Sequence, residues 1–84
     1  MTYSISILRR AQKELARLEK LDYERVRDAI YLLAEEPRPN NCKKLVGRDG
    51  WRLRIGDLRV IYEIADKTKM ITILHVGHRR EIYS

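Results

Sequence analysis

The chain has 84 residues, of which 44% are hydrophobic and 36% are charged, and it carries a net charge of +6 at pH 7. This length suffices for one modest hydrophobic core, so we expect a single domain over residues 1–84. The one cysteine, Cys42, cannot form an internal disulfide, and no apolar segment approaches the roughly 20 residues of a membrane span. Because the N-terminus also has no signal-peptide pattern, we expect a cytoplasmic protein without membrane contact.

The positive charge is concentrated in the second half of the chain. Residues 1–40 hold eight Lys/Arg and seven Asp/Glu, whereas residues 41–84 hold ten Lys/Arg and five Asp/Glu. A localised positive surface attracts polyanions, nucleic acid in particular. A net charge of this size also serves solubility in a small domain. Charge alone therefore leaves both interpretations open.

The first half reads as one strand and two helices. Alternation from Tyr3 to Leu8 predicts a short strand. Two apolar patterns at helical spacing follow and predict a helical hairpin, in which Asp22 is the expected N-cap of the second helix and Pro37 ends it. The residues of these patterns are Leu8, Ala11, Leu15 and Leu18, then Val26, Ala29, Ile30, Leu33 and Ala34.

The second half reads as sheet. It contains three strands, Trp51–Ile55, Leu58–Ala65 and Met70–Val76, and Lys43–Val46 is a possible short edge. Gly56-Asp57 between two alternating segments indicates a tight hairpin. The predicted fold class is therefore α+β, in the order β-α-α-β-β-β, with an N-terminal helical hairpin packed on a mainly antiparallel sheet.

Arginines alternate with apolar residues in the hairpin. Arg52 and Arg54 point to the face opposite the apolar set, and Arg59 is expected beside Arg54 on the same side. Guanidinium groups hold phosphate bidentately and stay charged at physiological pH. This face is either an anion-binding site or a solvated surface whose arginines pair with neighbouring carboxylates.

Other chemistries have little support in the sequence. His75 and His78 lie three residues apart without a cluster of acidic residues or cysteines, which fits no standard zinc spacing. The four glycines do not form a phosphate-binding loop, and Cys42 has no evident catalytic partner. We expect no metal and no cofactor.

Two segments together resemble a known family. WRLRIGDLRVIYEI at 51–64 and VGHRREIY at 76–83 are similar to the RelE/ParE toxin superfamily, on its RelE side. The similarity extends over essentially the whole chain, including Lys43-Lys44-Leu45 and the helix ending at 34–39. The resemblance implies a type II toxin–antitoxin toxin that cuts mRNA in the ribosomal A site. The resemblance implies that this reaction needs no metal, because the ribose 2′-OH attacks the neighbouring phosphorus. It also implies a RelB-like antitoxin as partner. The toxin would then contact operator DNA only through this antitoxin.

The resemblance also implies site residues. The two basic strand positions of the family fall on Arg52 and Arg54, the arginine after the turn on Arg59, and the C-terminal arginine and tyrosine on Arg79 and Tyr83. The best-known relatives have lysines at the first two positions, and arginine is too basic to accept a proton. We therefore predict that Arg52 and Arg54 bind phosphate.

Proton transfer would then need another group. His78, with an unperturbed pKa of about 6.5, is the predicted one, and Glu63 is a weaker choice. Contacts to mRNA or ribosomal RNA are predicted for four further cations: Lys43, Lys44, Arg48 and Arg80. Trp51 and Tyr62 are expected in the core, because they share parity with the apolar residues.

Two other functions stay open. A ParE-like toxin would share the fold, inhibit DNA gyrase and need no catalytic residues. A degenerate or non-catalytic module would bind RNA without cutting it.

Overall fold

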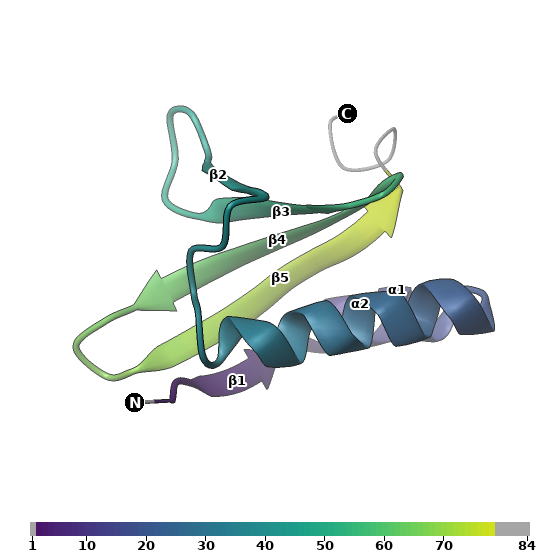
Figure 1. The fold of residues 1–84 in the computed structure, drawn as a ribbon, viewed down its shortest axis with the longest axis horizontal. Helices are drawn as coiled ribbons and strands as arrows, with labels where there is room; N and C mark the ends of the chain where they lie inside the picture. The colour runs from purple at the N-terminus through teal and green to yellow at the C-terminus, as the bar shows by residue number, and fades with distance from the viewer. Residues whose placement is uncertain (1, 79–84) are drawn as a thin grey trace.

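The described part of the computed structural model, residues 2–78, is a five-stranded sheet with two helices (Figure 1). The elements are β1 (Ser4–Ile7), α1 (Arg9–Ala16), α2 (Lys20–Leu33), β2 (Cys42–Lys44), β3 (Trp51–Ile55), β4 (Leu58–Ala65) and β5 (Met70–His78). The strand order is β1-β5-β4-β3-β2. Only the β1–β5 pair is parallel among these strands. The predicted α+β class is confirmed, and the possible edge strand is present as β2, which adds one strand to the expected order.

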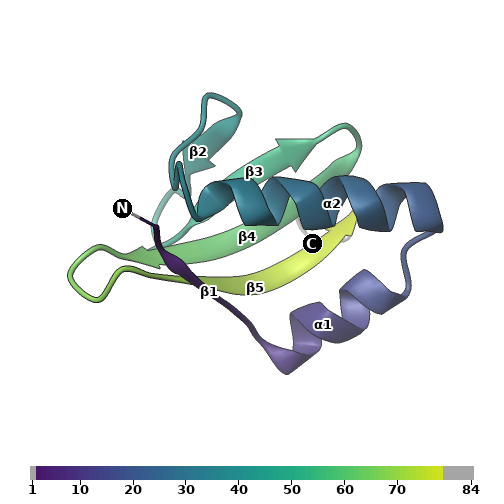
Figure 2. The same ribbon diagram turned by 60° about the horizontal axis from the view of Figure 1, so that its bottom comes forward.

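The helical hairpin covers one face of the sheet. Figure 2 shows α2 crossing β3 and β4, while α1 lies beside the end of β5. The prediction that Asp22 caps α2 is wrong, because the helix begins at Lys20 and Glu19 holds the N-cap position without a side-chain hydrogen bond. Asp22 instead lies in the first turn, where a carboxylate favours the positive end of the helix dipole.

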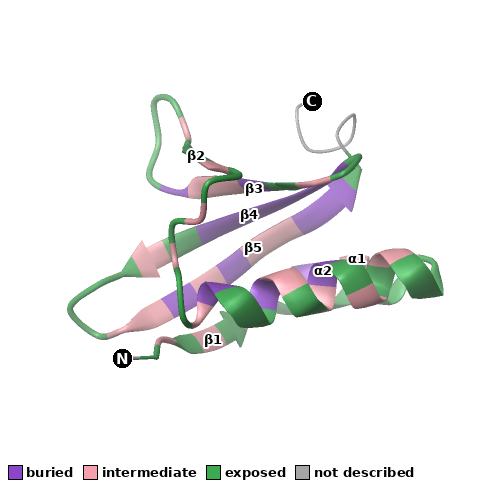
Figure 3. Cartoon of the chain, in the orientation of Figure 1, coloured by how far each residue is buried: buried purple, intermediate pink, exposed green. Residues whose placement is uncertain are grey.

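The core lies between α2, α1 and the covered face of the sheet (Figure 3). Its buried members are Ala11, Leu15, Val26, Ile30, Leu33, Leu53, Leu58, Val60, Tyr62, Ile71, Ile73 and Val76. Tyr62 is fully buried, as expected, and its hydroxyl donates to the Pro37 carbonyl oxygen at 2.8 Å. Burial, helped by the nearby Cys42 thiol, raises the Tyr62 pKa well above its usual range. Trp51 is only half-buried, at the margin of this core.

A bulge in β5 decides which of its residues face the helices. Tyr62 is paired with Ile73 and Ile61 with His75, so Leu74 is an extra residue without a partner on β4. Before the bulge, Ile71 and Ile73 are on the core side; after it, Val76 is. The alternation is therefore reversed in the last third of the strand.

No helix within residues 2–78 is long and apolar enough to cross a membrane.

Candidate anion-binding site

Cations from three strands lie in adjacent rows on the face opposite the helices. In the first row, Arg54 of β3 is paired with Arg59 of β4, which is paired with Gly77 of β5. In the second, Lys43 of β2 is paired with Arg52 of β3. Directly opposed residues of antiparallel strands project to the same side of the sheet. The register thus brings Arg52, Arg54 and Arg59 onto one face, as the alternation predicts.

Arg59 differs from the other arginines of residues 2–78 because it is buried, with 5% of its surface exposed. Its Nη1 donates to the carbonyl oxygens of Leu58 at 3.2 Å and Gly56 at 3.4 Å, whereas its buried Nε has no hydrogen-bond partner. No carboxylate of residues 2–78 forms an ion pair with it. A buried cation without a counter-charge is costly, and an arriving anion would relieve that cost.

The surroundings of Arg59 range from buried to open. Arg54, its cross-strand partner, is exposed, Arg52 is half-buried, and Ile61 beside Arg52 is buried. The sequence correctly predicted the side of the sheet on which Arg59 lies. The alternative of a solvated arginine is wrong for this residue, because Arg59 is buried. The result is one desolvated guanidinium next to an accessible one, which suits an anion that enters from solvent and ends against Arg59.

The Gly56-Asp57 turn, which joins β3 to β4 next to Arg54 and Arg59, contacts side chains on both faces of the sheet. Gly56 has φ +60°, a left-handed conformation that glycine adopts without steric cost. Its carbonyl oxygen accepts from Arg59 on one side. On the helix side, the Arg25 guanidinium is so near that a Cβ at position 56 would meet its Nη2 at 3.1 Å. Arg54 and Arg59, the pair nearest this turn, are therefore fixed relative to each other by the hairpin.

His78 lies on the other side of the sheet from the arginines. It is paired with Leu58, a core residue, because the bulge at Leu74 reverses the alternation of β5. Its side chain is exposed and lines a pocket with residues of the helical hairpin. These include Glu14, Arg17, Glu19 and Asp22. The structure therefore does not place His78 among Arg52, Arg54 and Arg59.

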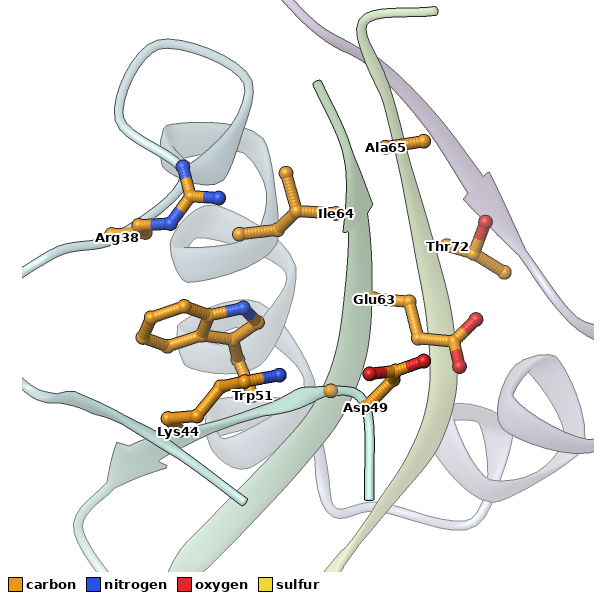
Figure 4. Close-up of a pocket in the computed structure, with 9 residues that line it drawn as sticks. Arg38, Lys44, Asp49, Trp51, Glu63, Ile64, Ala65 and Thr72 are labelled. Carbon is orange, nitrogen blue, oxygen red and sulfur yellow. The ribbon is translucent and has the colours of Figure 1, made fainter. Parts of the chain in front are cut away.

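The described members of the predicted RNA-binding set, Lys43, Lys44 and Arg48, are spread over the surface. Lys43 lies beside Arg52, whereas Lys44 projects from β2 to Trp51, with its Nζ 5.6 Å from the ring centroid. Figure 4 shows this Trp51 cluster, in which Arg38 also approaches the ring, at 5.2 Å. Arg48 is exposed in the loop between β2 and β3. Of these cations, only Lys43 belongs to the arginine face.

The structure also shows polar residues that the sequence analysis missed. Arg38 forms an ion pair with Asp66 at 2.9 Å, and Asp66 accepts a hydrogen bond from Tyr3 at 2.6 Å. The position of Arg38 between two prolines marked it as a loop residue and gave no sign of its partner. Glu14 was also missed, although its carboxylate accepts a hydrogen bond from the Val76 backbone N–H of β5.

Three predicted site residues, Arg79, Arg80 and Tyr83, lie outside the described residues. Within residues 2–78, no group of three or more His, Cys, Asp or Glu side chains is arranged to hold a metal ion. The described site is thus a set of guanidinium groups whose chemistry is the binding of anions.

Comparisons with known proteins place the chain in a family. The family model of the ParE toxin of type II toxin–antitoxin systems, parDE, matches residues 5–83. A search of curated proteins by sequence finds no match.

Solved structures of RelE toxins share the fold. The RelE–RelB complex from Pyrococcus horikoshii has a chain 38% identical to this one, with a TM-score of 0.84 over 94% of this chain and 97% of that chain. The RelBE2 complex from Mycobacterium tuberculosis gives 26% identity and a TM-score of 0.84 over 94% and 100%. The isolated RelE toxin of Escherichia coli is 26% identical, with a TM-score of 0.79 over 96% of this chain and 90% of that chain. The chain belongs to the RelE/ParE superfamily and is a toxin of a type II toxin–antitoxin system, with a RelE-like fold.

Proposed function

We propose that this toxin is a ribosome-dependent endoribonuclease that cuts mRNA in the ribosomal A site without a metal ion. The observation that carries the proposal is Arg59, a buried guanidinium with an unpartnered Nε, directly opposite the exposed Arg54. A scissile phosphodiester is an anion of suitable chemistry for this pair. Similarity to RelE structures supports this assignment over other anions.

The proposed reaction is an internal transfer at phosphorus. The 2′-OH loses its proton and its oxygen bonds to the adjacent phosphorus, while the bond to the 5′-oxygen breaks and that oxygen gains a proton. Arg54 and Arg59 stabilise the charge that develops on the phosphoryl oxygens, and Arg52 holds the neighbouring backbone. In this proposal Arg79 contributes a further positive charge, and Tyr83 orients the nucleotide.

His78 is the proposed proton-transfer group. Because it lies on the helix side of the sheet, it must reach the reacting oxygens past the end of β5, where its side chain is exposed. Replacing His78 with Gln, which keeps a polar side chain but cannot transfer a proton, should lower the cleavage rate and change the pH–rate profile. Full activity with an unchanged profile in His78→Gln would exclude this role.

We also propose a RelB-like antitoxin as the partner, because RelE in several of the matching structures is bound to RelB. A mainly apolar groove beside the end of α2 could receive an apolar segment of such a protein. It is lined by Leu32, which is 67% exposed, and by Leu33, Pro39 and Leu53, with Glu35 and Glu36 also lining it. Amphipathic helices commonly bind such grooves.

Inhibition of DNA gyrase is the second candidate function, and the ParE description of the matching family favours it. Such an activity would need no desolvated arginine for catalysis. The two functions leave different damage in a bacterial cell, since one removes translated mRNA and the other produces gyrase-dependent DNA breaks.

The first test is to map 5′ ends of an mRNA on purified ribosomes, with the protein and with no metal beyond what the ribosomes need. We expect a new end within the A-site codon. Arg54→Ala should reduce its rate of appearance about 100-fold, as loss of one transition-state donor does. Lys67→Ala is the matched control, because it removes one exposed cation from the turn at the opposite end of β4. An intact message with the wild-type protein would reject the nuclease proposal.

A further inference from the structure

The free edge of β5 is closed by a carboxylate of α1. Strand β1 is paired with β5 only from Met70 to Ile73, and the last backbone bond on that side is from Leu8 N to Ile73 O, at 3.0 Å. Beyond this point, no strand within residues 2–78 pairs with the outer side of β5. There the Val76 backbone N–H donates to Glu14 Oε1 at 2.9 Å, so a side chain takes the place of the missing strand.

The Glu14 carboxylate is held by several groups at once. Its Oε2 lies 3.6 Å from His75 Nδ1 and 4.0 Å from Arg10 Nε. Val76 itself is buried, and removal of the carboxylate would take away the acceptor that its N–H has in the structure. Glu14 is therefore the polar tie between α1 and the last residues of β5.

These last residues of β5 border the candidate site. Gly77 is paired with Arg59 and His78 with Leu58, one and two residues after the tied Val76. A shift of this segment would move the backbone that flanks the buried guanidinium, and it would move His78. Arg79 follows directly in the sequence.

We infer that Glu14 is a positioning residue for the ribonuclease reaction, acting through the Val76 N–H to fix the end of β5 beside Arg59. The inference rests on the proposed function. It assigns no chemistry to Glu14, which touches neither substrate nor reacting atoms.

The test compares three variants in the ribosome assay. Glu14→Ala removes the acceptor and should lower kcat about tenfold with KM nearly unchanged, since misplaced groups cost rate more than binding. Glu14→Gln keeps an oxygen acceptor for Val76 and should restore most of kcat. Gln12→Ala is the matched control, because Gln12 also ties α1 to a backbone carbonyl, that of Ile7 at 2.8 Å, away from the end of β5. Its kcat should stay near the wild-type value.

A readout independent of cleavage is amide hydrogen exchange at Val76, Gly77 and His78. We expect faster exchange there in Glu14→Ala, and near wild-type protection in Glu14→Gln and Gln12→Ala. Wild-type kcat in Glu14→Ala, or equal losses in Glu14→Ala and Gln12→Ala, would overturn the inference. Unchanged exchange at Val76 would overturn it as well. If the wild-type protein cuts no mRNA, the nuclease proposal fails, while the exchange experiment still tests whether Glu14 fixes the strand.

Discussion

A desolvated cation at a binding site stabilises the complex at the expense of the free protein. Arg59 shows this conflict, because its guanidinium is buried, its Nε is unpartnered and no carboxylate among residues 2–78 compensates it. The same property that makes the residue a strong anion ligand makes it unfavourable for folding.

Arg59→Met is expected to separate these two effects. Methionine fills much of the same space without a charge, so we expect the free energy of unfolding to rise by about 1 kcal/mol. Cleavage should fall at least about 100-fold. Urea unfolding and the 5′-end assay, carried out on the same preparation, measure the two quantities. Lower stability together with unimpaired cleavage would contradict an anion-binding role for Arg59.

Single-residue features were only partly predictable from the sequence. Alternation in β3 and β4 gave the correct side of the sheet for Arg52, Arg54 and Arg59. It could not give the burial of Arg59, because alternation along a strand shows which face of the sheet a side chain points to and not what covers that side chain. The alternation also could not show that His78 lies on the helix side of the sheet, because the bulge at Leu74 shifts the alternation of β5 and no residue type marks that bulge.

At the scale of elements, the periodic segments were the predictable ones. The strands β3 and β4 have the bounds that the alternation and the Gly56-Asp57 turn indicate. The start of α2 was not predictable, because Asp22 is a residue type that favours the N-cap but here lies inside the first turn. The tie between distant elements formed by Tyr3, Arg38 and Asp66 was not predictable either, since contacts across 28 and 63 residues leave no local pattern.

This tie predicts a pH-dependent contribution to stability. Arg38, then the Tyr3 hydroxyl, holds the pKa of Asp66 below its ordinary value. A lowered carboxyl pKa contributes stability that is present above the unfolded-state value of about 4 and is lost as pH falls through the folded-state pKa. Asp66→Asn should therefore lower the urea midpoint modestly at pH 7, and the difference from wild type should shrink towards about pH 3.

Asp28→Asn is the matched control for the tie. Asp28 pairs with the adjacent Arg27 at 3.1 Å and so connects no distant elements. Its replacement should change the urea midpoint less than Asp66→Asn does at pH 7. A difference between Asp66→Asn and wild type that stays constant from pH 7 to about pH 3 would show that the ionised carboxylate is not the source of the stability.

For the whole molecule, the question is whether the net charge or its placement attracts RNA. The net charge of +6 is shared by exposed cations at both ends of the sheet, whereas the arginine face concentrates Arg52, Arg54, Arg59 and Lys43 on three adjacent strands. A cation that contacts a phosphate releases a counterion, so its removal lowers the salt dependence of binding, whereas a distant cation acts only through a screened field.

The two contributions can be separated with a short single-stranded RNA titrated at about 50 to 200 mM salt. Arg54→Ala should reduce the slope of log K against log salt by roughly 0.7, the value for one phosphate contact on a single strand. Lys67→Ala removes the same charge from the turn beyond the far end of β4 and should leave the slope unchanged. Equal reductions in both variants would mean that the sheet attracts RNA by its overall charge. A reduced slope in Arg54→Ala alone would locate the RNA backbone on the face of the sheet where Arg59 is buried.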